Sequence, residues 1–191
     1  GREDPQAVAG MAGGYLLLAL GLVLTSVAAI VTVLRARDRV TGAMTAMGFG
    51  VLAWAGFLIV SAIAAVNAFL PNLLWAFGRG AFPADAATEW HILFHNLHYL
   101  PLMATVLTWH ALTQETTGTT SAFGSSFSKV VFASYLVFVP PTSLYHMFLE
   151  PNLAESVRVT GSLLSLFVSV PTLTAFLVIV SSLELATRAK G

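Results

Sequence analysis

The sequence contains no cysteine and few charged residues. The absence of cysteine excludes disulfides, thiol catalysis and cysteine-ligated zinc or iron–sulfur centres. Only 9% of the 191 residues are charged, whereas 57% are hydrophobic. A soluble domain usually has about 25% charged residues, so this chain lacks the polar groups to cover a globular surface. The composition therefore argues against a soluble enzyme and against intrinsic disorder.

The positive and negative charges of the chain are equal in number. Nine Lys and Arg stand against nine Asp and Glu, so there is no basic excess to bind nucleic acid. We expect an integral, multi-pass protein of the cell (plasma) membrane, with the lipid bilayer as a partner and no nucleic acid.

Five apolar segments are long enough to cross a bilayer, which takes about 20 residues per helix. The middle third of each segment has no Asp, Glu, Lys or Arg, as the cost of a charge in lipid requires. The segments are 13–34, 44–70, 91–112, 130–149 and 159–183. We therefore expect an all-α integral membrane protein with five transmembrane helices, in which residues 1–191 form a single transmembrane helical domain.

The distribution of Lys and Arg predicts the orientation of these helices. The connectors on the N-terminal side carry three such residues and those on the other side carry six. The six are Arg35, Arg37, Arg39, Lys129, Arg188 and Lys190. Because positive residues favour the cytoplasmic side, we expect the N-terminus outside and the C-terminus in the cytoplasm. The chain begins without methionine, which favours a processed protein or one piece of a longer polypeptide.

All five histidines lie in or beside the third and fourth segments. On a helix, His91, His95 and His98 fall within an arc of about 100°, and Tyr99 follows His95 by one turn. Imidazole is a common ligand of copper, iron and zinc, so this face is a candidate metal site. The alternative is that these histidines only form hydrogen bonds between helices.

Hydroxyl groups are spaced along the fifth segment at Ser165, Ser169, Thr172 and Thr174. Hydroxyls in membrane helices usually bond to a carbonyl of their own helix. They could instead form a proton path, which requires that they lie within reach of one another through one water. Spacing alone leaves both interpretations open.

Several stretches resemble subunit I of the B-type haem–copper oxygen reductases, in the cytochrome c oxidase superfamily. Residues 170–176 (VPTLTAF) and 182–188 (SLELATR) look like the eighth helix of that subunit. Residues 141–151 (PTSLYHMFLEP) resemble the segment with its adjacent pair of copper-binding histidines, and residues 95–99 (HNLHY) resemble the His-Pro-x-x-Tyr sequence of its sixth helix. The resemblance makes the five segments equivalent to helices four to eight.

The resemblance implies a copper site. His95 and His146 would be ligands, and Tyr99 would be the catalytic residue that donates a hydrogen atom. Tyr145 stands where the family has a histidine, so the third ligand would be Tyr145 or His98. Asn96 replaces the family's proline, which is a second departure.

The resemblance also implies a proton pathway and a dependence on other chains. His110, Thr172 and Thr174 match positions of the family's proton pathway. The family's haem ligands lie on its second and tenth helices, so haem would be held by other chains or by segments outside this sequence.

The function that these observations favour is a membrane subunit resembling the copper-site half of a terminal respiratory oxidase. It would reduce dioxygen to water and take up protons, as an oxidoreductase within a larger electron-transport complex of other membrane subunits or a homo-oligomer. Two alternatives remain open. One is a degenerate, non-catalytic structural subunit of a respiratory complex, and the other is a small haem-binding membrane electron carrier.

Overall fold

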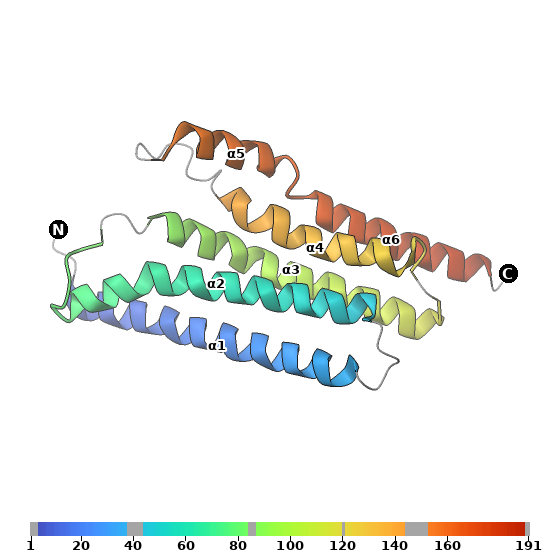
Figure 1. Ribbon diagram of the computed structural model, residues 1–191, viewed down its shortest axis with the longest axis horizontal. Helices are drawn as coiled ribbons and strands as arrows, with labels where there is room; N and C mark the ends of the chain where they lie inside the picture. Colours follow the sequence, from blue (N-terminus) through green and yellow to red (C-terminus); the bar gives the residue numbers. More distant parts are fainter. Residues whose placement is uncertain (1–3, 38–43, 84–86, 120, 144–152, 190–191) are drawn as a thin grey trace.

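The computed structural model describes all residues except 1–3, 38–43, 84–86, 120, 144–152 and 190–191. The described residues form α-helices and no β-strands (Figure 1). The helices are α1 (Pro5–Arg37), α2 (Ala46–Ala76), α3 (Ala87–Thr117), α4 (Gly124–Thr142), α5 (Glu155–Ser165) and α6 (Val170–Arg188). The expected all-α class is thus confirmed for this part of the chain.

The first four predicted segments each correspond to one helix. α1 and α3 contain the whole of 13–34 and 91–112. α2 begins within 44–70 and continues to Ala76, through Pro71. α4 begins before residue 130, and the last part of the 130–149 prediction lies outside the described residues.

The fifth predicted segment, 159–183, is interrupted. Residues 166–169 separate α5 from α6 and form hydrogen-bonded turns, in which the Phe167 N–H donates to the Leu164 carbonyl at 2.9 Å. Pro171 explains the break, because proline has no N–H to donate and its ring clashes with the carbonyl four residues earlier. The expectation of one helix here is therefore corrected to two shorter helices.

Three helical segments among the described residues are long and apolar enough to cross a membrane, namely α1, α2 and the combined segment Glu155–Arg188. α3 is less apolar because it carries four histidines, and the 19 residues of α4 include four serines and a lysine. Five crossings therefore remain a prediction.

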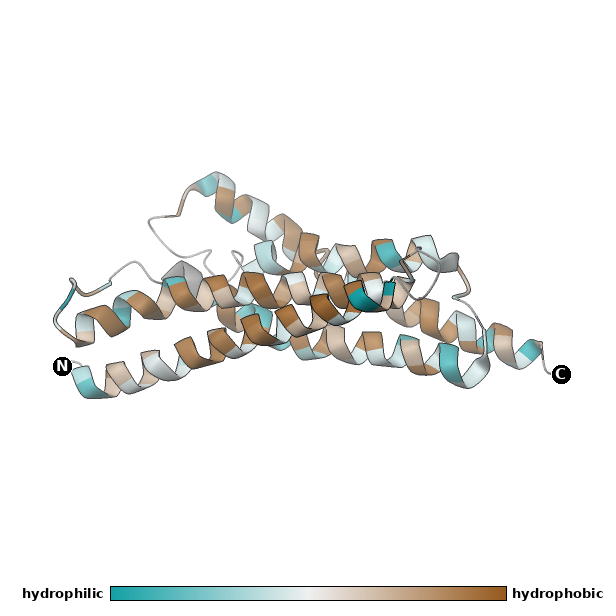
Figure 2. Cartoon of the chain, turned by 60° about the horizontal axis from the view of Figure 1, so that its bottom comes forward, coloured by the Kyte–Doolittle hydropathy of each residue, from teal (hydrophilic) through white to brown (hydrophobic). Residues whose placement is uncertain are grey.

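The outer surfaces of these helices are apolar. Leu17 and Leu24 on α1 are 71% and 61% exposed, and many large hydrophobic side chains of α5 and α6 are exposed as well. Figure 2 shows hydrophobic residues along most of the length of the helices, with strongly hydrophilic residues toward helix ends. Such continuous apolar surface is rare on soluble monomers and indicates a membrane protein.

The helices pack around α2, which contacts α1, α3 and α4, while α6 packs against α3 and α4. The core between α2, α3 and α4 includes Phe57, Met103 and Phe132. A second core between α1, α2 and α3 consists mainly of alanines around Phe69 and Leu93. Small side chains let these backbones approach closely, as is typical of helices packed within membranes.

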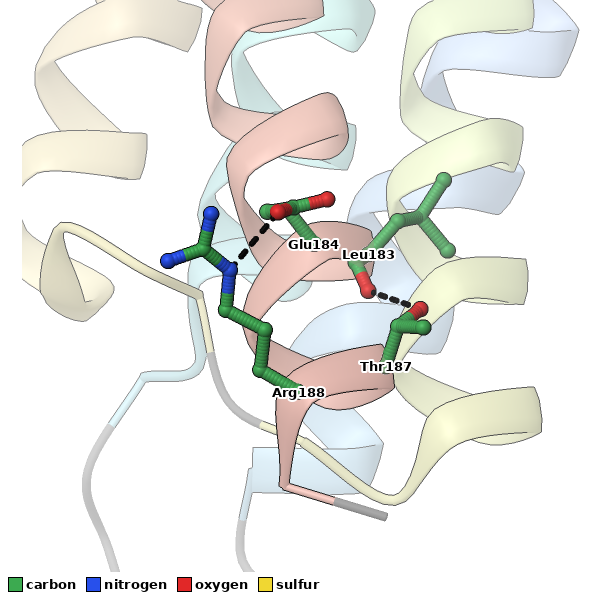
Figure 3. Close-up of polar contacts among 4 residues, drawn as sticks. All are labelled: Leu183, Glu184, Thr187 and Arg188. Carbon is green, nitrogen blue, oxygen red and sulfur yellow. Dashed lines mark hydrogen bonds and ion pairs between the residues drawn. The ribbon is translucent and has the colours of Figure 1, made fainter. Parts of the chain in front are cut away.

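The start of α1 and the end of α6 lie at opposite ends of the molecule, as an odd number of crossings requires (Figure 1). The last turn of α6 holds an ion pair between Arg188 Nε and Glu184 Oε1 at 2.7 Å, and Thr187 donates to the Leu183 carbonyl at 2.9 Å (Figure 3). The ion pair is exposed, so it contributes little to stability.

Candidate functional site

The first turns of α3 form a groove lined by histidines and aromatic rings. The groove has a volume of about 310 Å³, and its lining residues are Trp90, His91, Phe94, His95 and His98. The structure therefore brings together the three histidines that the sequence places on one helix face. We call this feature the histidine groove.

His95 and Tyr99 lie side by side on α3. Their ring centroids are 4.9 Å apart and the planes are inclined by 35°. Tyr99 does not line the groove and packs against the core between α2, α3 and α4. His98 is exposed, and its Nδ1 donates a hydrogen bond to the Phe94 carbonyl at 2.7 Å. This bond leaves Nε2 as the nitrogen of His98 that can bind a ligand.

The expected copper ligands come together only in part. His146 and Tyr145 lie outside the described residues, so the structure does not place them relative to His95. Within the described part of the chain, no group of three or more His, Cys, Asp or Glu residues is arranged to hold a metal ion. The three histidines of the groove thus do not form a complete metal site by themselves.

Thr172 has a partner that sequence reasoning did not identify. Its hydroxyl lies 2.9 Å from the hydroxyl of Tyr135, which links α6 to α4. The Tyr135 side chain is fully buried at 0% exposure, and Tyr99 packs against the core cluster to which Tyr135 belongs. The available signal was a tyrosine in the middle of an apolar segment, because a buried phenol needs a hydrogen-bond partner.

Two other hydroxyls of the fifth segment bond to their own helices. Thr174 donates to the Val170 carbonyl at 2.7 Å and Ser165 donates to the Ser162 carbonyl at 2.6 Å. Their local bonds match the usual behaviour of hydroxyls in membrane helices. Thr172 and Thr174 therefore differ in their contacts, although they are only two residues apart.

His110 occupies a closely packed site between α3, α4 and α6. It is only 4% exposed, its ring meets that of Phe132 edge to face, and its Nε2 is 3.2 Å from the Gln114 amide nitrogen. The space around it, which Ser128 also lines, is too small for a water molecule. No hydrogen bond among the described residues joins His110 to Thr172 or Thr174.

Comparison with known proteins identified one similarity. The chain is 28% identical over 158 residues to cytochrome c oxidase subunit 1 of Thermus thermophilus. The alignment covers 80% of this chain but 27% of that protein, so the chain spans about a quarter of the length of the curated relative it matches. No family model matches the chain. No solved structure matches it either. The similarity supports a relationship between this chain and the haem–copper oxidases.

Proposed function

We propose that the chain is a membrane subunit equivalent to helices four to eight of subunit I of a B-type haem–copper oxidase. Within a larger respiratory complex it takes part in the reduction of dioxygen to water. The observation that carries the proposal is that His95, which lines the histidine groove, lies beside Tyr99 in a chain similar to cytochrome c oxidase subunit 1.

Copper is the metal that we propose for this site. His95 and His146 are the proposed ligands, with His98 or Tyr145 as the third, and imidazole and phenolate are suitable donors for copper. When bound, copper would supply the binding and polarisation of dioxygen. Because His95 alone of the proposed pair is described, the fit of the metal rests on a residue outside the described part of the chain.

The role of Tyr99 follows from its place beside His95 and against the core of the bundle. We propose that its hydroxyl gives up a hydrogen atom to dioxygen. An electron from the haem-bearing partner chains and a proton from the bundle side then restore the tyrosine. Thr172 and its partner Tyr135 support this route, because their hydroxyls form a hydrogen bond and Tyr99 packs against the core cluster that contains Tyr135. Thr174 and His110 complete the proposed path from the cytoplasmic side, and both would have to exchange their present partners to carry protons.

Other membrane subunits are the proposed partners. Imidazole groups facing lipid are costly, so helices of another chain or of a second copy would cover the histidine groove. The haem ligands would come from those partners or from segments outside this sequence.

The proposal is tested by the optical difference spectrum, reduced minus oxidised, of the native complex purified through this chain. We expect haem bands together with further membrane polypeptides and oxygen consumption. Oxygen consumption should be lost in Tyr99→Phe while the haem bands persist. A chain that purifies alone, without haem bands, would contradict the proposal.

A second function is favoured by one observation. Tyr145 stands where the family has a copper-binding histidine, as expected for a degenerate structural subunit that kept the helix packing of an oxidase but lost its redox site. The same purification separates the two functions. A structural subunit would copurify with haem proteins, but substitution of His95 or Tyr99 would leave oxygen consumption unchanged.

A further inference from the structure

Helix α3 contains a proline directly after the part that carries the candidate site. Pro101 has no N–H, so it cannot donate the hydrogen bond that the Leu97 carbonyl would otherwise receive within the helix. The proline ring also crowds that carbonyl, and helices commonly bend at such a point. His95 and Tyr99 precede Pro101, and His110 follows it. The helix is therefore weakened between the candidate site and the rest of α3.

The indole of Trp54 on α2 bonds to α3 at this weakened point. Its Nε1–H donates to the Leu100 carbonyl at 3.0 Å, across the interface between two helices that lie side by side (Figure 1). A carbonyl oxygen has two lone pairs, so Leu100 can accept this bond in addition to one from its own helix. Leu100 is buried and lies between Tyr99 and Pro101 in the chain. The bond thus reaches the backbone next to the candidate catalytic tyrosine.

Packing supports the same placement. Trp54 and Tyr99 both pack against the core cluster between α2, α3 and α4. An indole has only two rotatable side-chain bonds and a fixed N–H direction, so a bond from it holds the accepting backbone in a defined position. A buried tryptophan usually finds some partner for its N–H. Here the partner is the one carbonyl that separates Tyr99 from the proline.

We propose that Trp54 is a positioning residue for the candidate site. By holding Leu100 against α2, it keeps α3 from bending at Pro101 and so fixes the Tyr99 ring beside His95. The role rests on the proposed function, in which Tyr99 gives a hydrogen atom to dioxygen, because a reacting group must be held in a set geometry. Whether Trp54 fixes the position of Tyr99 can be measured independently of oxygen consumption.

Fluorine NMR of the native complex, with a fluorotyrosine incorporated at position 99 alone, tests the proposal. We expect one resonance in the wild type and a shifted or split resonance in Trp54→Phe, because phenylalanine keeps an aromatic ring but lacks the N–H. The kcat for oxygen consumption should fall about tenfold, since a displacement of 1 Å can cost about 100-fold. The KM for dioxygen should change little, because Trp54 does not line the histidine groove.

Two further variants separate positioning from a general effect on the fold. Trp109→Phe is the matched control, because Trp109 lies on α3 beyond Pro101, is 46% exposed and packs its ring on Phe176 at 5.4 Å between centroids. It should leave the resonance and kcat unchanged. Pro101→Ala restores the missing N–H, so Trp54→Phe should have a much smaller effect in that background.

Three results would overturn the proposal. The first is an unchanged resonance in Trp54→Phe, and the second is an equal change in Trp54→Phe and Trp109→Phe. The third is an effect of Trp54→Phe that is the same with and without Pro101→Ala, since the bond would then support the fold without acting at the proline. A complex that consumes no oxygen, but whose resonance responds to Trp54→Phe and not to Trp109→Phe, would refute the oxidase function and still support the positioning of Tyr99.

Discussion

Buried polar side chains in the bundle differ in whether they have partners. Tyr135 bonds across the helix interface to Thr172, and Trp54 Nε1 donates to the Leu100 carbonyl at 3.0 Å. Asn96 is 0% exposed, and neither its amide nitrogen nor its amide oxygen has a hydrogen-bond partner in the described part of the chain. Satisfied groups hold the helices in register, whereas an unsatisfied amide destabilises the fold.

Removal of the Tyr135 hydroxyl should destabilise the protein. Tyr135→Phe deletes the bond to Thr172 and leaves a buried hydroxyl without its partner, so we expect a loss of about 1 kcal/mol in the free energy of unfolding. Denaturant titration of the detergent-solubilised protein measures this loss. Tyr15→Phe is the control, because Tyr15 is held by ring stacking on Phe69 at 4.2 Å between centroids. Equal effects of the two substitutions would contradict the prediction.

Replacement of Asn96 should stabilise the protein, in contrast to the replacement of Tyr135. Leucine branches at the same carbon, has the same number of side-chain heavy atoms and has no polar atoms, so Asn96→Leu should raise the free energy of unfolding by about 1 kcal/mol. The same titration measures it. A destabilised Asn96→Leu variant would contradict this prediction. It would mean that the Asn96 amide has a hydrogen-bond partner in the native protein.

At the scale of helices, α2 packs closely against α3 and α4 at Gly50. A Cβ atom there would lie 2.4 Å from Leu107 Cδ2 and 2.8 Å from Phe132 Cδ2. Glycine is therefore required by the packing of this interface, and not by the conformation of its own backbone.

Gly50→Ala should separate these helices. We expect a loss of about 1–3 kcal/mol, the usual cost of overpacking a core. Gly14→Ala on α1 is the matched control, because a Cβ there meets nothing within 4 Å and alanine favours helix. Thermal unfolding followed by circular dichroism should show a lower Tm for Gly50→Ala and an equal or higher Tm for Gly14→Ala. An unchanged Tm in Gly50→Ala would contradict the packing described here.

The sequence predicts the existence of helices better than their interruptions and contacts. Length and apolarity were enough to locate α1 to α4, because a helix is the simplest way to satisfy backbone polar groups in lipid. The break between α5 and α6 depends on the local effect of Pro171. The mean hydropathy of the segment is not changed by such a break and therefore cannot predict it. The Tyr135–Thr172 bond joins residues 37 positions apart, and spacing along one helix cannot predict it. By contrast, helical spacing predicted that His91, His95 and His98 share one face, and all three line the histidine groove.

At the scale of the whole molecule, the orientation in the membrane is a prediction from charge. The segment 35–39 holds three arginines and should face the cytoplasm. Because the chain has no native cysteine, Ala36→Cys gives a unique label site. An impermeant thiol reagent added to intact cells should not reach it, but should label Ala81→Cys in the exposed loop after α2. The reverse pattern would overturn the orientation.

The central claim is that His95 belongs to a copper site within an oxidase complex. Elemental analysis of the native complex, purified through this chain, tests it most directly. The account predicts copper and haem iron in the wild type, and a loss of copper equivalent to one ion per chain in His95→Ala with the haem iron retained. His91→Ala serves as the control and should keep the copper. A copper content that is the same in the wild type and His95→Ala would contradict the claim.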